Sequence, residues 1–320
     1  MTNNDDEELP AYSAAPPPGP PPGHQPHPPP AQPAWDDNSA PAYPPPPGLL
    51  HEFSSAANAT TDEADNAQRW CAAFPLAPPF AMDDATLRSV HAHQHTLIMP
   101  PGFNGTVNQT NVNHSIWRVT SNGCKDTLFQ TALPAYSHYD DSPMLTERAK
   151  TIYFEIGIHS IGKQHSRIGS MLHRHNEVSQ DSGIAIGFFA PPYPPFRLPG
   201  WQRGSLAVHS DDGRRYVGND AGGFDFTEPF RAGETIGLGM MFTPLHTKAG
   251  PQTRTEVFFT RNGVKAGGWD LLHTDDARES IVGLRGECDI FPAIGVFGNV
   301  DVDVNFGEPS WLYRGYTQRT

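Results

Sequence analysis

Apolar residues are distributed unevenly along the 320-residue chain. Residues 1–65 contain few of them and are rich in proline and acidic residues, whereas large apolar side chains first cluster in residues 66–82. A segment so poor in apolar residues cannot bury enough surface to offset the entropy that folding costs. The pattern therefore predicts a disordered, proline-rich amino-terminal tail over 1–65. The cluster expected to mark the edge of the folded body and to pack on it consists of Trp70, Phe74, Leu76 and Phe80.

From Thr151 onward, short apolar or alternating segments are separated by turn sequences, and no helical period of comparable length appears. Asn262-Gly263 is the strongest hairpin signal among these turns, because both central residues of a type I′ turn need a positive φ. Many short antiparallel strands with glycine-rich turns predict an all-β sandwich. The strands expected in it are 151–159, 182–189, 206–210, 234–242, 255–260, 264–266, 291–297 and 301–306.

The region before Thr151 has a mixed pattern. Residues 96–99 and 115–119 are typical of short strands, and the Gly- and Asn-rich stretch 101–113 between them indicates a loop. We expect residues 66–150 to be an extension that packs on the sandwich. The sandwich itself is expected over 151–307, followed by a carboxy-terminal tail over 308–320.

Charge and cysteine content narrow the setting. The net charge is −13, of which −10 belongs to residues 1–68, so the body offers no basic footprint for nucleic acid or an anionic membrane. The three cysteines, Cys71, Cys124 and Cys288, form neither a disulfide framework nor a zinc pattern. The acidic amino terminus does not fit a secretory signal, and no run reaches the ~18–20 apolar residues of a membrane helix. We therefore expect a cytoplasmic protein.

An ordered series of motifs resembles the SPRY family of protein-binding modules. It covers about 151–307, nearly half of the chain, and each motif alone is weak. The motifs are YFEI at 153–156, IAIGFF at 184–189, LPGW at 198–201, VHSDDGRRY at 208–216, ETIGLG at 234–239, EVFFTRNG at 256–263, FPAIGV at 291–296 and VNFG at 304–307. The resemblance implies a bent antiparallel sandwich whose loops bind a client protein, without catalysis and without a cofactor or metal.

The stretch YPPFRLPGW at 193–201 is most similar to fungal SPRY proteins of the endosome and vacuole. That resemblance implies an adaptor that recruits a WW-domain HECT ubiquitin ligase to a client, such as a membrane transporter, for sorting or degradation. Those proteins carry an amino-terminal membrane anchor that this sequence does not show. We therefore expect attachment to endosomal or vacuolar membranes through partners, without direct insertion.

Six residues of the SPRY-like region are candidates for the client-binding surface. Large aromatic residues and arginine are favoured as binding anchors, so Tyr193 and Arg197 are expected to be exposed. Trp201 suits an anchor or a core position equally. Asp211, Asp212 and Tyr216 are expected to form an adjacent rim.

Proline-tyrosine motifs are candidates for WW binding. Leu9-Pro10-Ala11-Tyr12 presents a Leu-Pro-x-Tyr ligand in the predicted tail, where polyproline II would offer proline to an aromatic groove. Pro41-Ala42-Tyr43 is a degenerate second copy. For Leu133-Pro134-Ala135-Tyr136 we instead expect an ordered segment with Tyr136 packed on the sandwich. Such short patterns also arise by chance in proline-rich sequence.

Other chemistry is weakly indicated. The alternating His91, His93 and His95 suit a metal site less well than a polar loop or strand surface, because no carboxylate or cysteine nearby completes a ligand set. The pair Asp211-Asp212 precedes glycine and indicates a turn, not general acid–base catalysis. Two alternatives stay open: a scaffold subunit of a stable intracellular complex unrelated to HECT ligases, and a lectin-like sandwich with hydrolase activity.

Overall fold

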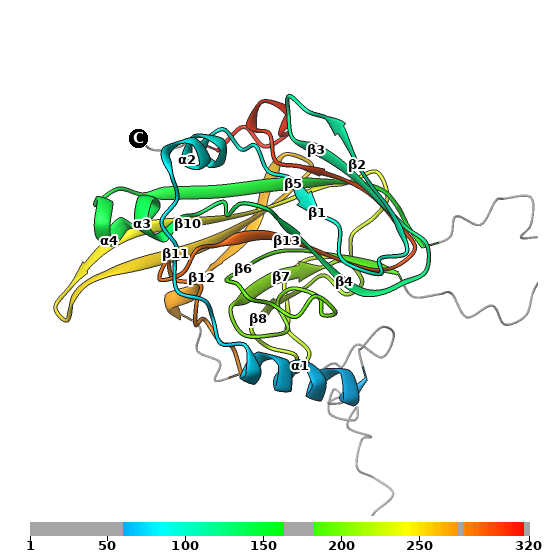
Figure 1. Ribbon diagram of the computed structural model, residues 1–320, viewed down its shortest axis with the longest axis horizontal. Helices are drawn as coiled ribbons and strands as arrows, with labels where there is room; N and C mark the ends of the chain where they lie inside the picture. The colour runs from blue at the N-terminus through cyan, green and yellow to red at the C-terminus, as the bar shows by residue number, and fades with distance from the viewer. Residues whose placement is uncertain (1–59, 163–181, 274–277, 317–320) are drawn as a thin grey trace, which may run out of the picture. The chain divides into compact units, whose positions relative to one another are not determined.

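Two antiparallel sheets of seven strands each form a sandwich (Figure 1). The computed structural model describes residues 60–162, 182–273 and 278–316. Sheet A has the strand order β1-β4-β13-β6-β7-β8-β9, and sheet B has the order β12-β11-β10-β5-β14-β3-β2. The prediction of an all-β antiparallel sandwich is confirmed.

The strands of sheet A are β1 Leu97–Ile98, β4 Cys124–Thr131, β13 Phe291–Gly298, β6 Gly183–Phe189, β7 Ser205–His209, β8 Arg214–Val217 and β9 Phe224–Asp225. Those of sheet B are β12 Val264–Asp270, β11 Gly250–Arg261, β10 Thr235–Thr247, β5 Lys150–Ile161, β14 Val300–Asn305, β3 Ile116–Ser121 and β2 Gly105–Asn111. The helices are α1 Thr61–Ala73, α2 Asp84–His91, α3 His138–Asp141 and α4 Pro143–Thr146, with 3-10 turns η2 Leu271–His273 and η3 Glu308–Ser310.

The core lies between the sheets and follows the two-residue period of a strand. In β14, Val300, Val302 and Val304 point inward and are buried, while the residues between them are half-exposed. The central strands β6 and β13 of sheet A differ, because every residue in them is buried. Both faces of sheet A are therefore covered at its centre, which requires a third layer outside these two strands.

Residues before Thr151 supply strands to both sheets. β4 pairs with β13 in sheet A, and β3 pairs with β14 in sheet B. The expected short strands at 96–99 and 115–119 correspond to β1 and β3, but the loop expected over 101–113 is wrong for β2. That strand is polar and exposed, and its pairing with β3 sets its conformation where its own sequence does not.

Helix α1 begins earlier than the predicted boundary of the tail. Thr60 and Glu63 form a capping box, in which each side chain accepts a hydrogen bond from the backbone N–H of the other residue. The expected disorder is thus wrong for residues 60–65, and the part that concerns residues 1–59 lies outside the described residues. In the part of the chain that the structure describes, no helix has the length and apolar character needed to cross a membrane.

The apolar cluster after α1 packs less completely than expected. Leu76 packs against the core, but Phe74 and Phe80 are 51% and 45% exposed. The Phe74 ring lies 4.9 Å from the ring of Trp70 on the same helix, so these two residues contact each other instead of the core. The hairpin prediction is confirmed: Asn262 and Gly263 have φ values of 52° and 77°.

The predicted carboxy-terminal tail is packed as far as Tyr316. Trp311 is fully buried and Tyr316 nearly so, and both rings contact Tyr153 on the outer face of sheet B. Residues 308–316 therefore belong to the folded body.

Candidate functional site

The third layer outside sheet A is the segment 190–204, here called the covering loop, which joins β6 to β7. Its Tyr193 packs on Leu128 and Phe189, and its Leu198 and Trp201 pack with other side chains of the same face. Gly295 in β13 makes room for it, because a Cβ there would lie 2.6 Å from Cδ of Pro199 and 2.8 Å from Cδ2 of Leu198. The partners of Leu198 and Trp201 are Ala185, Ala207, Tyr216 and Phe297.

Hydrogen bonds inside the covering loop fix its conformation. The Tyr193 hydroxyl donates to the Leu198 carbonyl at 2.6 Å and accepts from the Gln202 N–H at 3.1 Å. The Ser205 hydroxyl donates to the Gln202 carbonyl at 2.7 Å and accepts from the Gly200 N–H at 2.8 Å. The loop is therefore held from within as well as by the sheet.

Two of the predicted client-binding residues are less accessible than expected. Tyr193 is 5% exposed and Arg197 is 2% exposed, so the expectation that they lie on the surface is wrong. The phenol of Tyr193 is used within the loop, and burial raises its pKa to about 12. Trp201 is 7% exposed and takes the core position that was one of its two alternatives.

Arg197 is a buried cation with incomplete pairing. Its guanidinium lies 4.3 Å from the centre of the Trp201 ring, and its Nη2 lies 4.0 Å from the Asp220 carboxylate. Its Nε and Nη1 have no hydrogen-bond partner among the described residues. A buried donor without a hydrogen-bond partner costs free energy, so an acceptor that reached Nε or Nη1 of Arg197 would bind favourably.

The turn after β7 lies beside the covering loop. Asp212 accepts hydrogen bonds from the Arg214 N–H at 2.9 Å and from the Tyr216 hydroxyl at 2.8 Å. The ring of His209 stacks on Tyr216 with centroids 4.1 Å apart, and its Nε2 is 2.9 Å from the Pro199 carbonyl. Burial lowers the pKa of His209.

The fold thus brings the six predicted residues together, with different roles. Asp211 is exposed and Asp212 half-buried, whereas Tyr216 is 3% exposed and lies inside the predicted rim. The centroids of the Trp201 and Tyr216 rings are 6.4 Å apart, and this contact joins the covering loop to the turn after β7. Two acidic residues with their carboxylates near Arg197, Asp126 and Asp220, were not found from the sequence.

Asp126 is the clearest electrostatic feature that sequence reasoning missed. Burial raises its pKa to about 7; the charge of Arg197 opposes the rise, and the charges of Glu63 and Asp211 add to it. Asp126 reaches this place because β4 pairs with β13, a register set by long-range pairing that no local motif around residue 126 reveals.

The other sequence candidates are resolved in part. Tyr136 is fully buried, donates to the Gly286 carbonyl at 3.1 Å and stacks on Phe242, which confirms the ordered alternative for residues 133–136. The WW-binding candidates Leu9, Pro10, Tyr12, Pro41 and Tyr43 lie outside the described residues.

The expected polar surface is confirmed for His91, whose side chain is 50% exposed, and is wrong for His93 and His95. His95 is 3% exposed, and burial lowers its pKa to about 3. His93 is half-buried against Trp311, and burial lowers its pKa to about 4. Across residues 60–162, 182–273 and 278–316, no group of three metal-ligating side chains comes together.

No model of a protein family matches the chain. The chain is 36% identical over 130 residues to "Protein ssh4" of Sclerotinia sclerotiorum, covering 41% of this chain and 20% of that protein. It is 28% identical over 137 residues to a SPRY domain-containing protein of Schizosaccharomyces pombe, covering 43% of this chain and 29% of that protein. The matched region therefore spans 20% to 29% of the length of these relatives.

Among solved structures, a human SPRY domain is 22% identical with a TM-score of 0.36, covering 59% of this chain and 91% of that one. The curated relatives confirm the resemblance to fungal SPRY proteins that the motifs predicted.

Proposed function

We propose that this SPRY-type chain is a non-catalytic adaptor whose covering loop and neighbouring turn bind a client protein. In this proposal the motif Leu9-Pro10-Ala11-Tyr12 recruits a WW-domain HECT ubiquitin ligase, and catalysis takes place in that partner. The adaptor raises the local concentration of ligase at the client. The client belongs to the sorting or degradation traffic of endosomal or vacuolar membranes, and a membrane transporter fits that description.

The observation that carries the client-binding role is the rigid covering loop bordered by carboxylates. Asp211 and Asp220 are exposed beside it, and Arg197 lies within it with unpaired N–H groups. A surface held in one conformation loses little entropy on binding, which favours recognition.

The titratable side chains of this region support a structural use. The Tyr193 hydroxyl and the His209 ring are hydrogen-bonded to main-chain atoms of the loop, and Asp212 holds Tyr216. Groups committed in this way shape a surface, whereas general acid–base catalysis needs a group within reach of a reacting proton.

The ligase arm is tested by a pull-down of the full chain with tandem WW domains. Tyr12→Ala is expected to reduce binding at least ten-fold. Tyr43→Ala alone is expected to have a smaller effect, and the double variant should abolish binding, because two linked motifs gain avidity of ~10²–10⁴. Tyr139→Ala is the matched control, since Tyr139 is 51% exposed on α3 and lies outside the proline-rich tail.

Undiminished binding in the double variant would remove the ligase arm. A fixed stoichiometric complex purified from cells without a HECT ligase would then favour a scaffold subunit of another kind.

The client arm is tested by proximity labelling in cells. The double variant Asp211→Asn, Asp220→Asn is expected to lose most of the proteins labelled by the wild type, because it removes charge from the border of the loop without changing its size. The control is Glu308→Gln, because Glu308 is an exposed acidic residue on η3 and does not belong to the covering loop or its neighbouring turn. Retention of the full labelled set by the double variant would rule out this surface as the client site.

A further inference from the structure

The hairpin of β10 and β11 projects beyond the strands that flank it (Figure 1). In the described part of the chain, β5 pairs with β10 only as far as Phe242, and β12 pairs with β11 only from Glu256 onward. Residues 250–255 of β11, here called the β11 edge, therefore have β10 on one side and no described strand on the other.

The register shows which main-chain groups point out of the β11 edge. The Asn262 N–H donates to the Thr235 carbonyl at 2.7 Å, so every second pair from there along β10 and β11 exchanges hydrogen bonds. Thr253, opposite Pro244, falls between two bonded pairs, so its N–H and C=O point away from β10. Neither group has a hydrogen-bond partner among the described residues. Thr253 can therefore exchange two main-chain hydrogen bonds with one residue of an added strand.

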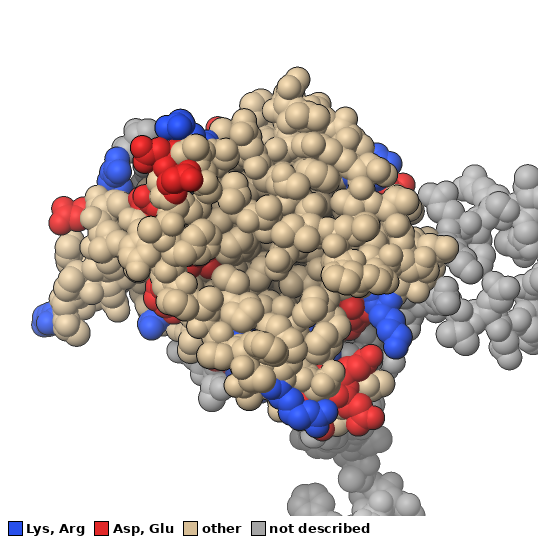
Figure 2. Space-filling model, viewed as in Figure 1, with Lys and Arg blue, Asp and Glu red and all other residues tan. Residues whose placement is uncertain are grey.

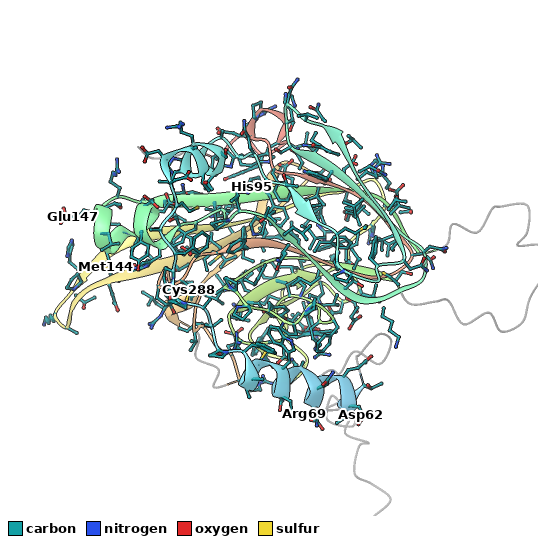
Figure 3. All side chains as sticks on the ribbon, viewed as in Figure 1. Asp62, Arg69, His95, Met144, Glu147 and Cys288 are labelled. Carbon is teal, nitrogen blue, oxygen red and sulfur yellow. The ribbon has the colours of Figure 1, made fainter. Side chains whose placement is uncertain are left out.

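A cavity of about 310 Å³ borders the β11 edge on its core face. Strand alternation places the Thr253 side chain on the same face as the buried Val257. Thr253 lines the cavity together with Met144 of α4 and Arg285, which precedes β13. Figure 3 shows Met144 on the side of α4 toward the hairpin. Because residues directly opposite each other share a face, a side chain placed opposite Thr253 would enter this cavity.

Arg285 gives this cavity a charge preference. It is exposed, and its guanidinium makes no hydrogen bond or ion pair among the described residues. Glu287 is the one acidic residue among the described lining residues, and its carboxylate accepts from the Gly283 N–H and the Arg285 N–H, each at 2.7 Å. The acid is thus satisfied by main-chain donors, whereas the cation is not paired. The cavity therefore favours a carboxylate side chain.

A second cavity, of about 580 Å³, borders the β11 edge on its outer face. Gln252 and Arg254, the neighbours of Thr253, point to this face and line the cavity, and Leu245 is the strand partner of Gln252. The Arg254 guanidinium is already held in two ion pairs. Leu245 and Leu272 supply the rest of the lining, so this cavity favours an apolar side chain.

Little on the hairpin deters an added strand. Sheet edges are commonly protected by charged side chains and prolines. Lys248 is the one charged residue from Thr243 to Thr253, and Figure 2 shows the projecting hairpin as uncharged apart from its tip. Pro251 has no N–H, so an added strand can use its carbonyl but gains no donor there. The usable edge is therefore short and centred on Thr253.

We propose that the β11 edge takes an extended segment of a partner protein as an added antiparallel strand of sheet B. An acidic residue of that segment lies opposite Thr253, exchanges both main-chain hydrogen bonds with it and directs its carboxylate to Arg285. The residues before and after the acid are apolar and lie over Leu245 and Leu272. Main-chain bonds supply affinity, and the two cavities supply the sequence preference. None of these residues belongs to the covering loop, so the inference does not rest on the proposed client-binding role.

The probe is a fluorescein-labelled, amidated peptide of sequence Gly-Leu-Glu-Leu-Gly, and its binding to the full chain is measured by fluorescence anisotropy. Arg285→Glu is expected to weaken binding at least ten-fold. The same variant should bind Gly-Leu-Lys-Leu-Gly at least ten-fold more tightly than the wild type does, because the charges are reversed together. The matched control is Arg69→Glu, since Arg69 is exposed on α1 (Figure 3) and should leave both affinities unchanged.

The main-chain pairing is tested without changing the protein. N-methylation of the glutamate removes the N–H that would donate to the Thr253 carbonyl, and it is expected to weaken binding at least ten-fold. N-methylation of the second leucine is the control, because the N–H of a residue next to the bonded pair points away from β11. In hydrogen exchange, the unmodified peptide should slow the Thr253 N–H at least ten-fold.

Two results would overturn the proposed strand addition: equal effects of the two N-methyl groups, and unchanged exchange at Thr253 with saturating peptide. No binding to the wild type at millimolar peptide would do the same. Equal affinity of the wild type for the glutamate and lysine peptides would contradict the preference for an acidic residue.

Discussion

Buried polar side chains join parts of the chain that are distant in sequence. The carboxylate of Glu155 on β5 is 2% exposed and accepts hydrogen bonds from the N–H groups of Leu312 and Tyr313, each at 2.8 Å. It also accepts from the Tyr153 hydroxyl at 3.0 Å. One side chain thus holds the carboxy-terminal segment against sheet B.

Replacing this carboxylate should loosen that segment. In Glu155→Gln an amide NH₂ faces a backbone N–H, so one buried donor loses its acceptor, and we expect a loss of about 1–3 kcal/mol in the free energy of unfolding. Urea denaturation measures the loss, and hydrogen exchange should show faster exchange at Leu312 and Tyr313. Glu308→Gln, exposed, should change neither quantity; equal effects of the two substitutions would contradict this role for Glu155.

His95 should make stability depend on pH. Burial lowers its pKa to about 3, whereas an unfolded histidine has a pKa of about 6.5. The unfolded state therefore binds the proton more readily. The free energy of unfolding is highest above pH 6.5, where His95 is neutral in both states, and it falls as the pH drops toward 3. Between pH 7 and pH 4 this histidine should contribute a loss of about 3 kcal/mol. Denaturation of His95→Asn over that range should show a smaller loss, while His246→Asn on an exposed strand end should follow the wild type.

At the scale of elements, hairpins of sheet B follow local rules closely. β11 and β12 are joined by Asn262-Gly263, where Gly263 has a φ of 77°. A Cβ at Gly263 would lie 2.9 Å from the Leu312 carbonyl oxygen, whereas a Cβ at Gly233, with a φ of 89°, would meet nothing within 4 Å. Substitutions at these two glycines therefore separate the cost of backbone strain, which both share, from the cost of a steric contact, which only Gly263 has.

Alanine substitutions at these glycines should therefore differ. Gly233→Ala is expected to cost about 1–2 kcal/mol from the left-handed conformation alone. Gly263→Ala should cost more than that, because it also pushes against the carboxy-terminal segment. Thermal melts of both variants compare the costs, and equal shifts in melting temperature would show that the contact with Leu312 is relieved without cost.

The predictability of an element depended on how local its determinants are. β11 alternates between buried and half-buried positions and ends at the Asn262-Gly263 turn, so the sequence predicts its second half, over 255–260. β2 is polar and owes its conformation to pairing with β3, and α1 rests on a capping box within a segment that composition alone marks as disordered. At the site, proximity of the six candidates followed from the motifs. The burial of Arg197 and the position of Asp126 near it did not follow from the motifs, because both depend on layers formed by strands that are distant in the sequence.

The whole body depends on strands from both ends of the described chain. β3 and β4 lie in the middle of the strand pairings, between β2 and β14 and between β1 and β13 respectively. The fragment 151–307 lacks these strands and the segment held by Glu155. It should therefore be unfolded or aggregate through the edges of β13 and β14, whereas 60–316 should fold cooperatively, as judged by circular dichroism and size-exclusion chromatography. A soluble, cooperatively melting 151–307 fragment would contradict this dependence.

The pairing of β3 with β14 also determines how early in translation sheet B can be completed. Thr120 in β3 and its partner Asp301 in β14 are 181 residues apart. A ribosome adding ~5–20 residues per second therefore synthesises β14 roughly 10–40 s after β3. During that interval the nascent polypeptide exposes the inner face of β5 and a free edge of β3. Closure of the sandwich is thus a late event of translation, and chaperones that shield emerging strands should govern the yield of this protein more than its final stability does.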